Sequence, residues 1–328
     1  MNRPQIVVFS GSEARYQDIV SQLSNHGVEF IYLDLDEIGK KPNQNLIDCV
    51  ALWVEFSRKI DSDLLRHFPS LKYIFSSTTG LGHIDSEFCS SQGILVWGLN
   101  NFPEISGEVT STPEFTWLLI LAVFRKLEQN LINREITARE IIEKRELNRG
   151  SQIKGKNIGV IGFGRVGRQI CNYALSFGME VGFFDILPIS LVDTEKRFNQ
   201  FDTLEKLLEC CDVIVIAASQ SEKQQKIITA MNIGRVKQGS ILINTARGSL
   251  WDEEAVLRAL RMGRLAGVGV DVYEIEENHD ISSSPLLNYT NKDLNLIKTP
   301  HIGGATIDAQ KFVTEKLGLK IIEILIDN

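Results

Sequence analysis

The sequence predicts an α/β protein with two domains, each built around a parallel sheet. Strand-like apolar runs alternate with helix-like segments along the whole chain, which is typical of parallel strands covered by helices. A glycine-rich turn, Gly162 to Gly167, directly follows one of these runs and opens a helix-like segment. The 328 residues, 43% of them hydrophobic, suffice for two domains with separate cores.

The first series of runs predicts a small sheet domain. Its expected strands are residues 6–9, 30–33, 50–54, 73–75 and 94–97, and its expected helices are residues 14–23 and 62–68. A buried helix should follow, because a hydroxyl residue can cap a helix that starts at Pro113 and stays apolar up to Phe124.

The second series predicts a larger sheet domain. Its expected strands are residues 157–161, 180–185, 213–216, 240–243, 266–270 and 294–297. The tail from Thr306 to Ile326 fits an amphipathic helix that packs back on the first domain. Its apolar positions are Phe312, Leu317, Leu319, Ile321, Ile322 and Leu325. We therefore expect one domain of residues 1–104, completed by the C-terminal helix 302–328, and a second of residues 105–301.

Composition argues against several classes of function. The net charge of −7 includes no basic stripe, so nucleic acid is not an expected partner. The longest apolar run, residues 117–124, is far shorter than the roughly 20 residues that cross a bilayer, and residues 1–4 lead straight into a strand-like run. We expect no membrane span, no signal peptide and a cytoplasmic protein. The 5 cysteines lack metal-type spacing, so we expect them to fill the core and expect no metal site.

The glycine-rich turn has the spacing of a dinucleotide-binding loop. Gly162 allows the tight turn, Gly164 lets a pyrophosphate approach the backbone, and Gly167 lets the helix pack closely on the strand. The phosphates would rest on free N–H groups at the start of the helix, around Arg165 and Val166. The turn therefore predicts a doubly wound, Rossmann-like domain.

An acid at the end of the next expected strand selects the cofactor. Asp185 lies 18 residues after Gly167, where a carboxylate accepts hydrogen bonds from the adenosine ribose hydroxyls. It would repel a 2′-phosphate, and residues 186–188 supply no arginine to bind one. The sequence thus favours NAD over NADP.

Four polar groups follow three further strands of the same expected sheet. Arg247 follows the first, Asp271 and Glu276 the second, and His301 the third. Singly, they also fit a solvated loop arginine, surface acids and a structural histidine. Because ligands bind in a crevice outside the carboxyl ends of parallel strands, we expect all four residues to face the same crevice as the glycine turn.

Together these motifs resemble the D-isomer-specific 2-hydroxyacid dehydrogenases, including phosphoglycerate dehydrogenase-like members, over nearly the whole chain. The matching stretches are the glycine turn, Asn244–Gly248, Asp271–Glu276 and Thr299–Thr306. The resemblance implies two Rossmann-like domains, one binding NAD and a smaller, flavodoxin-like one binding substrate. It also implies a homodimer that transfers a hydride between NAD(H) and the C2 carbon of a small D-2-hydroxy or 2-keto acid.

The resemblance also implies a role for each residue. His301 would be the acid/base, Glu276 would pair with it and favour its imidazolium form, and Arg247 would hold the substrate carboxylate. Asp271 would contact the nicotinamide end of the cofactor. The loop from Thr78 to Asp85 looks like the family's substrate loop, in which the backbone N–H groups of Thr79 and Gly80 would bind the carboxylate, whereas His83 would be a loop residue.

Two departures and two alternatives accompany the resemblance. Residues 217–220 lack the family's usual histidine and proline, which leaves cofactor contacts from this loop open. Phosphoglycerate-specific members place an arginine where this chain has residues 55–57. The carboxylate of Glu55 would repel a substrate phosphate there, although Arg58 could compensate if the alignment shifts. Formate dehydrogenases carry an amide where Glu276 stands, which counts against that activity. Relatives resembling C-terminal binding protein use the NAD-bound fold as an interaction scaffold, a corepressor-like role that keeps the same residues.

Overall fold

The computed structural model describes residues 5–23, 27–38, 44–55, 59–131, 135–192, 195–219, 226–274 and 284–326. The chain forms two compact units, Met1–Val109 with Thr306–Asn328, and Thr110–Ala305. The divisions fall a few residues beyond the expected 104 and 301. The first of these is the smaller unit and the second is the larger unit.

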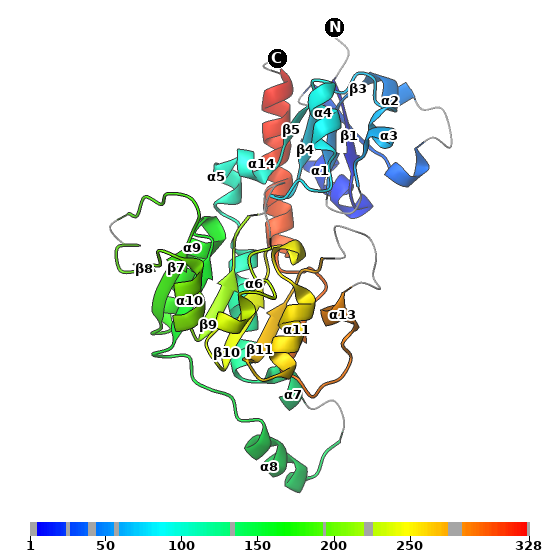
Figure 1. The fold of residues 1–328 in the computed structure, drawn as a ribbon. Helices are drawn as coiled ribbons and strands as arrows, with labels where there is room; N and C mark the ends of the chain where they lie inside the picture. The colour runs from blue at the N-terminus through cyan, green and yellow to red at the C-terminus, as the bar shows by residue number, and fades with distance from the viewer. Residues whose placement is uncertain are drawn as a thin grey trace. The chain divides into compact units, whose positions relative to one another are not determined.

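The smaller unit contains a five-stranded parallel sheet with the order β2-β1-β3-β4-β5 (Figure 1). Its strands are β1 (Gln5–Ser10), β2 (Val28–Tyr32), β3 (Cys49–Val54), β4 (Tyr73–Ser76) and β5 (Leu95–Trp97). All five strands were expected from the apolar runs. The chain leaves β1 toward β2 on one side and toward β3 on the other, which is the flavodoxin-like order.

Helices cover both faces of this smaller sheet. On one face, α1 (Glu13–Leu23) and α14 (Ile307–Ile326) share an apolar cluster with Trp53 and Phe75. On the other face lie α2 (Gln44–Asp48), α3 (Ser62–Leu65) and α4 (Ser86–Ser91). The expected packing of the C-terminal helix is confirmed, and Gly318 makes it close, since a Cβ there would lie 2.1 Å from Leu23. Leu319 was wrongly assigned to the apolar face and is 42% exposed.

The larger unit contains a seven-stranded sheet with the order β12-β11-β10-β9-β6-β7-β8, in which neighbouring strands pair in parallel. Its strands are β6 (Asn157–Ile161), β7 (Glu180–Phe184), β8 (Asn199–Gln200), β9 (Val213–Ile216), β10 (Ser240–Asn244), β11 (Leu265–Val270) and β12 (Leu296–Lys298). Only β8 was not expected, because its two exposed polar residues leave no apolar pattern to recognise.

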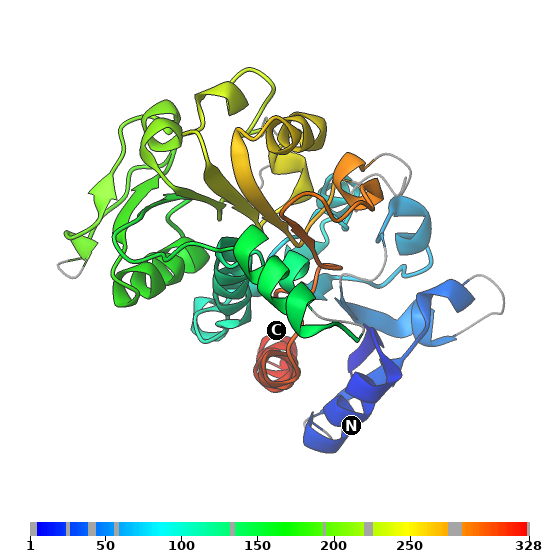
Figure 2. The same cartoon turned by 90° about the horizontal axis from the view of Figure 1, so that it is seen from below.

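The larger sheet is doubly wound, as predicted. Helices α6 (Ser111–Phe124) and α9 (Arg165–Ser176) share one apolar cluster with it, while α10 (Leu204–Cys210) and α11 (Glu253–Arg261) share another. Figure 2 shows α9 on one side of these strands and α10 and α11 on the other. Three short helices, α7 (Leu127–Asn130), α8 (Ala138–Leu147) and α13 (Pro285–Asn288), lie in the connections.

Two local expectations were wrong. Helix α6 begins at Ser111 instead of Pro113, and its N-cap Thr110 makes no side-chain capping bond. The first turn tolerates Pro113 there because its N–H would have no partner within the helix. Cys210 is exposed, whereas the other four cysteines are buried as expected. Among the described helices, none is long and apolar enough to span a membrane.

Candidate functional site

The three glycines of the turn between β6 and α9 differ in how closely other atoms surround them. Gly162 has φ 95°, and a Cβ there would lie 2.6 Å from the backbone of Ala218, in the loop after β9. A Cβ on Gly167 would lie 2.1 Å from the carbonyl oxygen of Gly162. A Cβ on Gly164 would meet no described atom within 4 Å. The space beside Gly164 is therefore open to a bound group.

The first turn of α9 offers donors to an anion. Gly164 is the N-cap and provides no side-chain cap, and the N–H groups of Gly164 and Val166 have no acceptor within the described part of the chain. Arg165 is the first residue of the helix, and burial lowers the pKa of its guanidinium. Unpaired N–H groups and the positive end of the helix dipole suit a pyrophosphate.

Asp185 follows β7 and is held by the backbone around it. Its Oδ2 accepts a hydrogen bond from the Phe163 N–H at 2.7 Å, and its Oδ1 accepts one from the Leu187 N–H at 2.9 Å. Each carboxylate oxygen has a second lone pair, so the ribose hydroxyls of a dinucleotide still find acceptors. The turn from Gly162 to Gly167 and Asp185 thus fit NAD.

The second arginine of α9, Arg168, is engaged within the protein. The Arg168 guanidinium carbon lies 4.5 Å from the centre of the Phe163 ring, and its Nη1 pairs with Glu195 Oε2. Burial alone would raise the pKa of Glu195, but the hydrogen bonds from Arg168 and from the Val192 N–H, together with the Arg168 charge, outweigh it and lower that pKa. An arginine paired in this way is not offered to a 2′-phosphate, which again favours NAD.

Arg247 lies in the turn after β10, and residues next to it in this turn fix its backbone. The Asn244 side chain donates to the Arg247 carbonyl at 2.9 Å and accepts from the Ala246 N–H at 3.0 Å, closing the turn. The Thr245 hydroxyl lies 2.6 Å from that of Thr116 on α6. Arg247 is half-buried, and its Nη1 donates to the Ala246 carbonyl at 2.6 Å. Sequence reasoning missed Asn244 as the residue that shapes this turn, although its place at the end of a strand was a signal.

The turn after β12 presents His301 in an unusual backbone conformation, with φ 55°. Asp271, at the end of β11 and 1% exposed, holds both sides of this turn. Its Oδ1 accepts from the Thr299 hydroxyl at 2.5 Å and from the Ile302 N–H at 3.0 Å, and its Oδ2 accepts from the Gly303 N–H at 2.8 Å. The Asp271 carboxylate therefore fixes the peptide that carries His301.

Glu276 lies outside the described residues, but the flanks of its segment are held by a buried acid. Glu253, the first residue of α11, is 2% exposed. Its Oε1 accepts from the Glu274 N–H at 3.0 Å, and its Oε2 accepts from the Ser284 hydroxyl. Sequence reasoning missed Glu253, because an acid in the first helical turn is also ordinary on a solvated surface.

The sheet brings most of the predicted residues to one edge. Strands β6, β10, β11 and β12 run parallel in a single sheet, so the glycine turn, Arg247, Asp271 and His301 all follow carboxyl ends on that edge. This edge combines a helix start with unpaired N–H groups, a guanidinium and an imidazole. No cluster of three or more histidine, cysteine or acidic side chains that could hold a metal ion occurs among the described residues.

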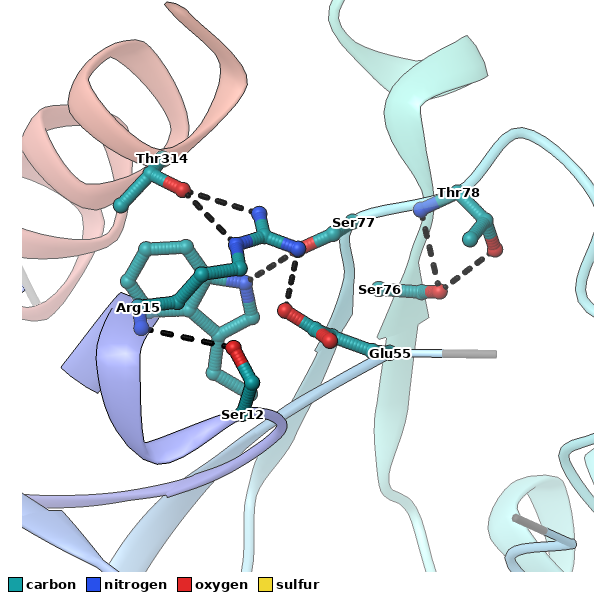
Figure 3. Close-up of polar contacts among 8 residues, drawn as sticks. Ser12, Arg15, Glu55, Ser76, Ser77, Thr78 and Thr314 are labelled. Atoms are coloured by element: carbon teal, nitrogen blue, oxygen red, sulfur yellow. Dashed lines mark hydrogen bonds and ion pairs between the residues drawn. The ribbon is translucent and has the colours of Figure 1, made fainter. Parts of the chain in front are cut away.

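Thr79 and Gly80 belong to the smaller unit, in the loop after β4. The Thr78 hydroxyl lies 2.9 Å from the Ser76 hydroxyl (Figure 3). It also donates to the Gly80 carbonyl at 2.8 Å, which shapes the loop. The N–H groups of Thr79 and Gly80 donate to no group in the part of the chain that the structure describes. Two adjacent unpaired N–H groups suit a carboxylate. His83 is 8% exposed, as a structural loop residue would be.

Comparisons with known proteins identify the family of this chain. A family model described as D-isomer specific 2-hydroxyacid dehydrogenase, NAD binding domain, matches residues 117–303. Glyoxylate reductase of Thermococcus kodakarensis is 32% identical over 283 residues, which is 84% of this chain and 80% of that protein. D-3-phosphoglycerate dehydrogenase of Bacillus subtilis is 30% identical over 317 residues, which is 93% of this chain but only 56% of that protein. A crystal structure of D-lactate dehydrogenase from Aquifex aeolicus, complexed with NAD and lactic acid, aligns with TM-score 0.77 and 26% identity, covering 98% of this chain and 96% of that one.

Proposed function

Because the chain belongs to the D-isomer specific 2-hydroxyacid dehydrogenases, we propose that it interconverts a small 2-keto acid and its D-2-hydroxy acid with Arg247, Glu276 and His301 as the catalytic residues. The chain is an NAD-dependent dehydrogenase with a Rossmann-like cofactor domain. One observation supports the residue assignment most directly. Hydrogen bonds from Asn244 hold the Arg247 turn, and hydrogen bonds to Asp271 hold the His301 turn. Both turns lie on the sheet edge that also carries the glycine turn.

Each proposed role follows from the chemistry of the side chain. The imidazole of His301 donates a proton to the carbonyl oxygen during reduction and takes it back during oxidation. The guanidinium of Arg247 binds the substrate carboxylate and polarises the carbonyl, a task that suits a planar and permanently charged group. Glu276 favours the imidazolium form of His301. Bound NADH supplies the hydride that C2 receives.

Several chain segments would hold the cofactor and the substrate. The N–H groups from Gly164 to Gly167 would hold the pyrophosphate, and Asp185 would hold the adenosine ribose. Asp271 would place the His301 turn and contact the nicotinamide end. In the smaller unit, the N–H groups of Thr79 and Gly80 would bind the substrate carboxylate. This unit is therefore the proposed substrate domain.

A substrate panel tests the proposal. We expect NADH to be consumed with at least one of glyoxylate, hydroxypyruvate, pyruvate or a branched 2-keto acid, and chiral products to have the D configuration. Formation of the L product would contradict the stereochemistry. A protein that binds NADH, turns over no 2-keto acid and captures a protein partner would instead be an NAD-bound interaction scaffold.

We also propose that the protein is a cytoplasmic homodimer that associates through α8 and the adjacent face of the larger unit. No residue of α8 is buried, and Ile141, Ile142 and Leu147 are 49%, 54% and 78% exposed. An apolar hollow beside α8 is lined by Leu121 and Phe177, among others. Helix α8 carries both acidic and basic residues, so a second copy offers complementary charges. The four buried cysteine thiols are free, which suits a reducing compartment.

Light scattering after size exclusion tests the dimer. The wild type should have twice the 36.9 kDa mass of the chain, and Ile142→Glu combined with Leu147→Glu should give the single-chain mass. Glu205→Gln, an exposed substitution on α10, is the matched control. A double variant that keeps the wild-type mass would exclude this face as the interface.

A further inference from the structure

The smaller sheet has a topological switch point between β1 and β3. From this pair of strands the chain proceeds to β2 on one side and to β4 and β5 on the other. In open parallel sheets, ligands bind outside the carboxyl ends of the strands at such a point. Gly11 and Ser12 follow β1 there, and Glu55 follows β3. The Thr79–Gly80 loop follows β4, the strand next to β3.

An ion pair occupies this switch point. Arg15, from the first turns of α1, pairs through Nη1 with Glu55 Oε1 (Figure 3). Arg15 also donates to the Thr314 hydroxyl of α14, from Nη2 at 2.8 Å and from Nε at 3.2 Å. Its side chain is 13% exposed and that of Glu55 is 19% exposed. The guanidinium is thus committed within the protein, and the pair presents no net positive charge.

The Glu55 carboxylate lies directly against Gly11. A Cβ on Gly11 would lie 2.5 Å from the Glu55 carboxylate carbon, so a larger residue there would displace the Glu55 side chain. Burial raises the pKa of Glu55, while the Arg15 charge and the Ser12 N–H oppose that rise. A carboxylate has about four lone-pair positions, which leaves it able to accept a further hydrogen bond from a ligand.

We propose that Glu55, positioned by Arg15, determines the substrate class by accepting a hydrogen bond from a hydroxyl on C3 of the 2-keto acid and by repelling a phosphate there. The inference rests on the proposed function, with the smaller unit as the substrate domain. The preferred substrate is then a short 3-hydroxy-2-keto acid. Its phosphorylated counterpart is disfavoured, because Arg15 is neutralised by Glu55 and held by Thr314.

Relative kcat/KM values test this assignment, with hydroxypyruvate, pyruvate and phosphohydroxypyruvate as probes and NADH saturating. A hydrogen bond to a charged acceptor predicts that wild type prefers hydroxypyruvate over pyruvate by about tenfold to a hundredfold. Glu55→Met removes the acceptor and should abolish that preference while pyruvate turnover and the Kd for NADH persist. Glu55→Gln keeps the shape, should lower the preference in part, and should improve phosphohydroxypyruvate. Glu87→Gln, an exposed change on α4, is the control.

The outcomes separate the two proposals. An unchanged ratio of hydroxypyruvate to pyruvate in both Glu55 variants would overturn the role of Glu55 and leave the dehydrogenase assignment intact. A wild-type protein that prefers phosphohydroxypyruvate over hydroxypyruvate would also overturn the role of Glu55 and leave the dehydrogenase assignment intact. Loss of folding in Glu55→Met, seen by circular dichroism, leaves Glu55→Gln to decide. NADH binding without turnover of any 2-keto acid would overturn the proposed function, and the inference with it.

Discussion

The substitution Asp271→Asn tests whether the Asp271 carboxylate holds the His301 turn. The Asp271 carboxylate accepts three hydrogen bonds, two on Oδ1 and one on Oδ2, from groups on either side of His301. Asparagine keeps one oxygen, and its amide nitrogen would face the Gly303 N–H, donor against donor. Asp271→Asn therefore breaks one hydrogen bond to a charged acceptor and leaves a buried N–H without a partner.

The cost can be estimated from these contacts. A lost hydrogen bond to a charged acceptor and an unsatisfied buried N–H together predict a loss of about 2–4 kcal/mol of unfolding free energy. The midpoint of thermal unfolding should fall by about 5–15 °C for a unit of this size. A displaced imidazole should lower kcat by about tenfold to a hundredfold.

Steady-state NADH oxidation, NADH binding by fluorescence titration and thermal unfolding measure the three effects. Asp202→Asn, whose side chain is 80% exposed, is the matched control. If Asp271 acts by holding the turn, the Kd for NADH stays at its wild-type value while kcat falls; if it also contacts the nicotinamide end, that Kd rises as well. An Asp271→Asn protein with wild-type kcat and stability would refute the positioning role.

Two further predictions concern the cofactor domain. Gly167→Ala should lower stability and abolish NADH binding, because its Cβ would lie 2.1 Å from the Gly162 carbonyl oxygen, whereas Gly164→Ala should keep stability and lose only NADH affinity. Equal unfolding midpoints for the two variants would contradict this distinction. Glu195 has a folded-state pKa below its ordinary 4.5, because burial, which raises it, is outweighed by the hydrogen bonds from Arg168 and the Val192 N–H and by the Arg168 charge. Its contribution to stability is therefore present above pH 4.5 and is lost as the pH falls through the lowered value. Glu195→Gln should be less stable than wild type at neutral pH, with a difference in urea unfolding that shrinks in acid; a difference that is constant with pH would refute the pairing.

Local signals explain why most of the fold was predictable. A strand buried on both faces needs a continuous apolar run, and a turn with positive φ favours glycine, so β6 and Gly162 are visible in the sequence. The two residues of β8 carry no such pattern. The start of α6 was misplaced because proline is compatible with any position of the first helical turn, where the backbone N–H is not needed.

Partners distant in the sequence were not predictable, because tertiary packing chooses them. The sequence identifies Arg247 and His301 as candidates, since each follows an apolar run. It does not reveal that Asp271 bonds to both sides of the His301 turn, or that Arg15 from a helix pairs with Glu55, which follows a strand. Periodicity places a residue on an element, but the contact depends on how two elements pack.

The central claim is that His301 handles the proton in a reduction at C2, and His301→Gln tests it most directly. With the 2-keto acid that wild type reduces fastest, the variant should lose about 10²–10⁴-fold in kcat, because a general acid typically contributes that much. Its Kd for NADH and its unfolding midpoint should match those of wild type. A His301→Gln protein that reduces the same substrate at the wild-type rate would contradict the assignment.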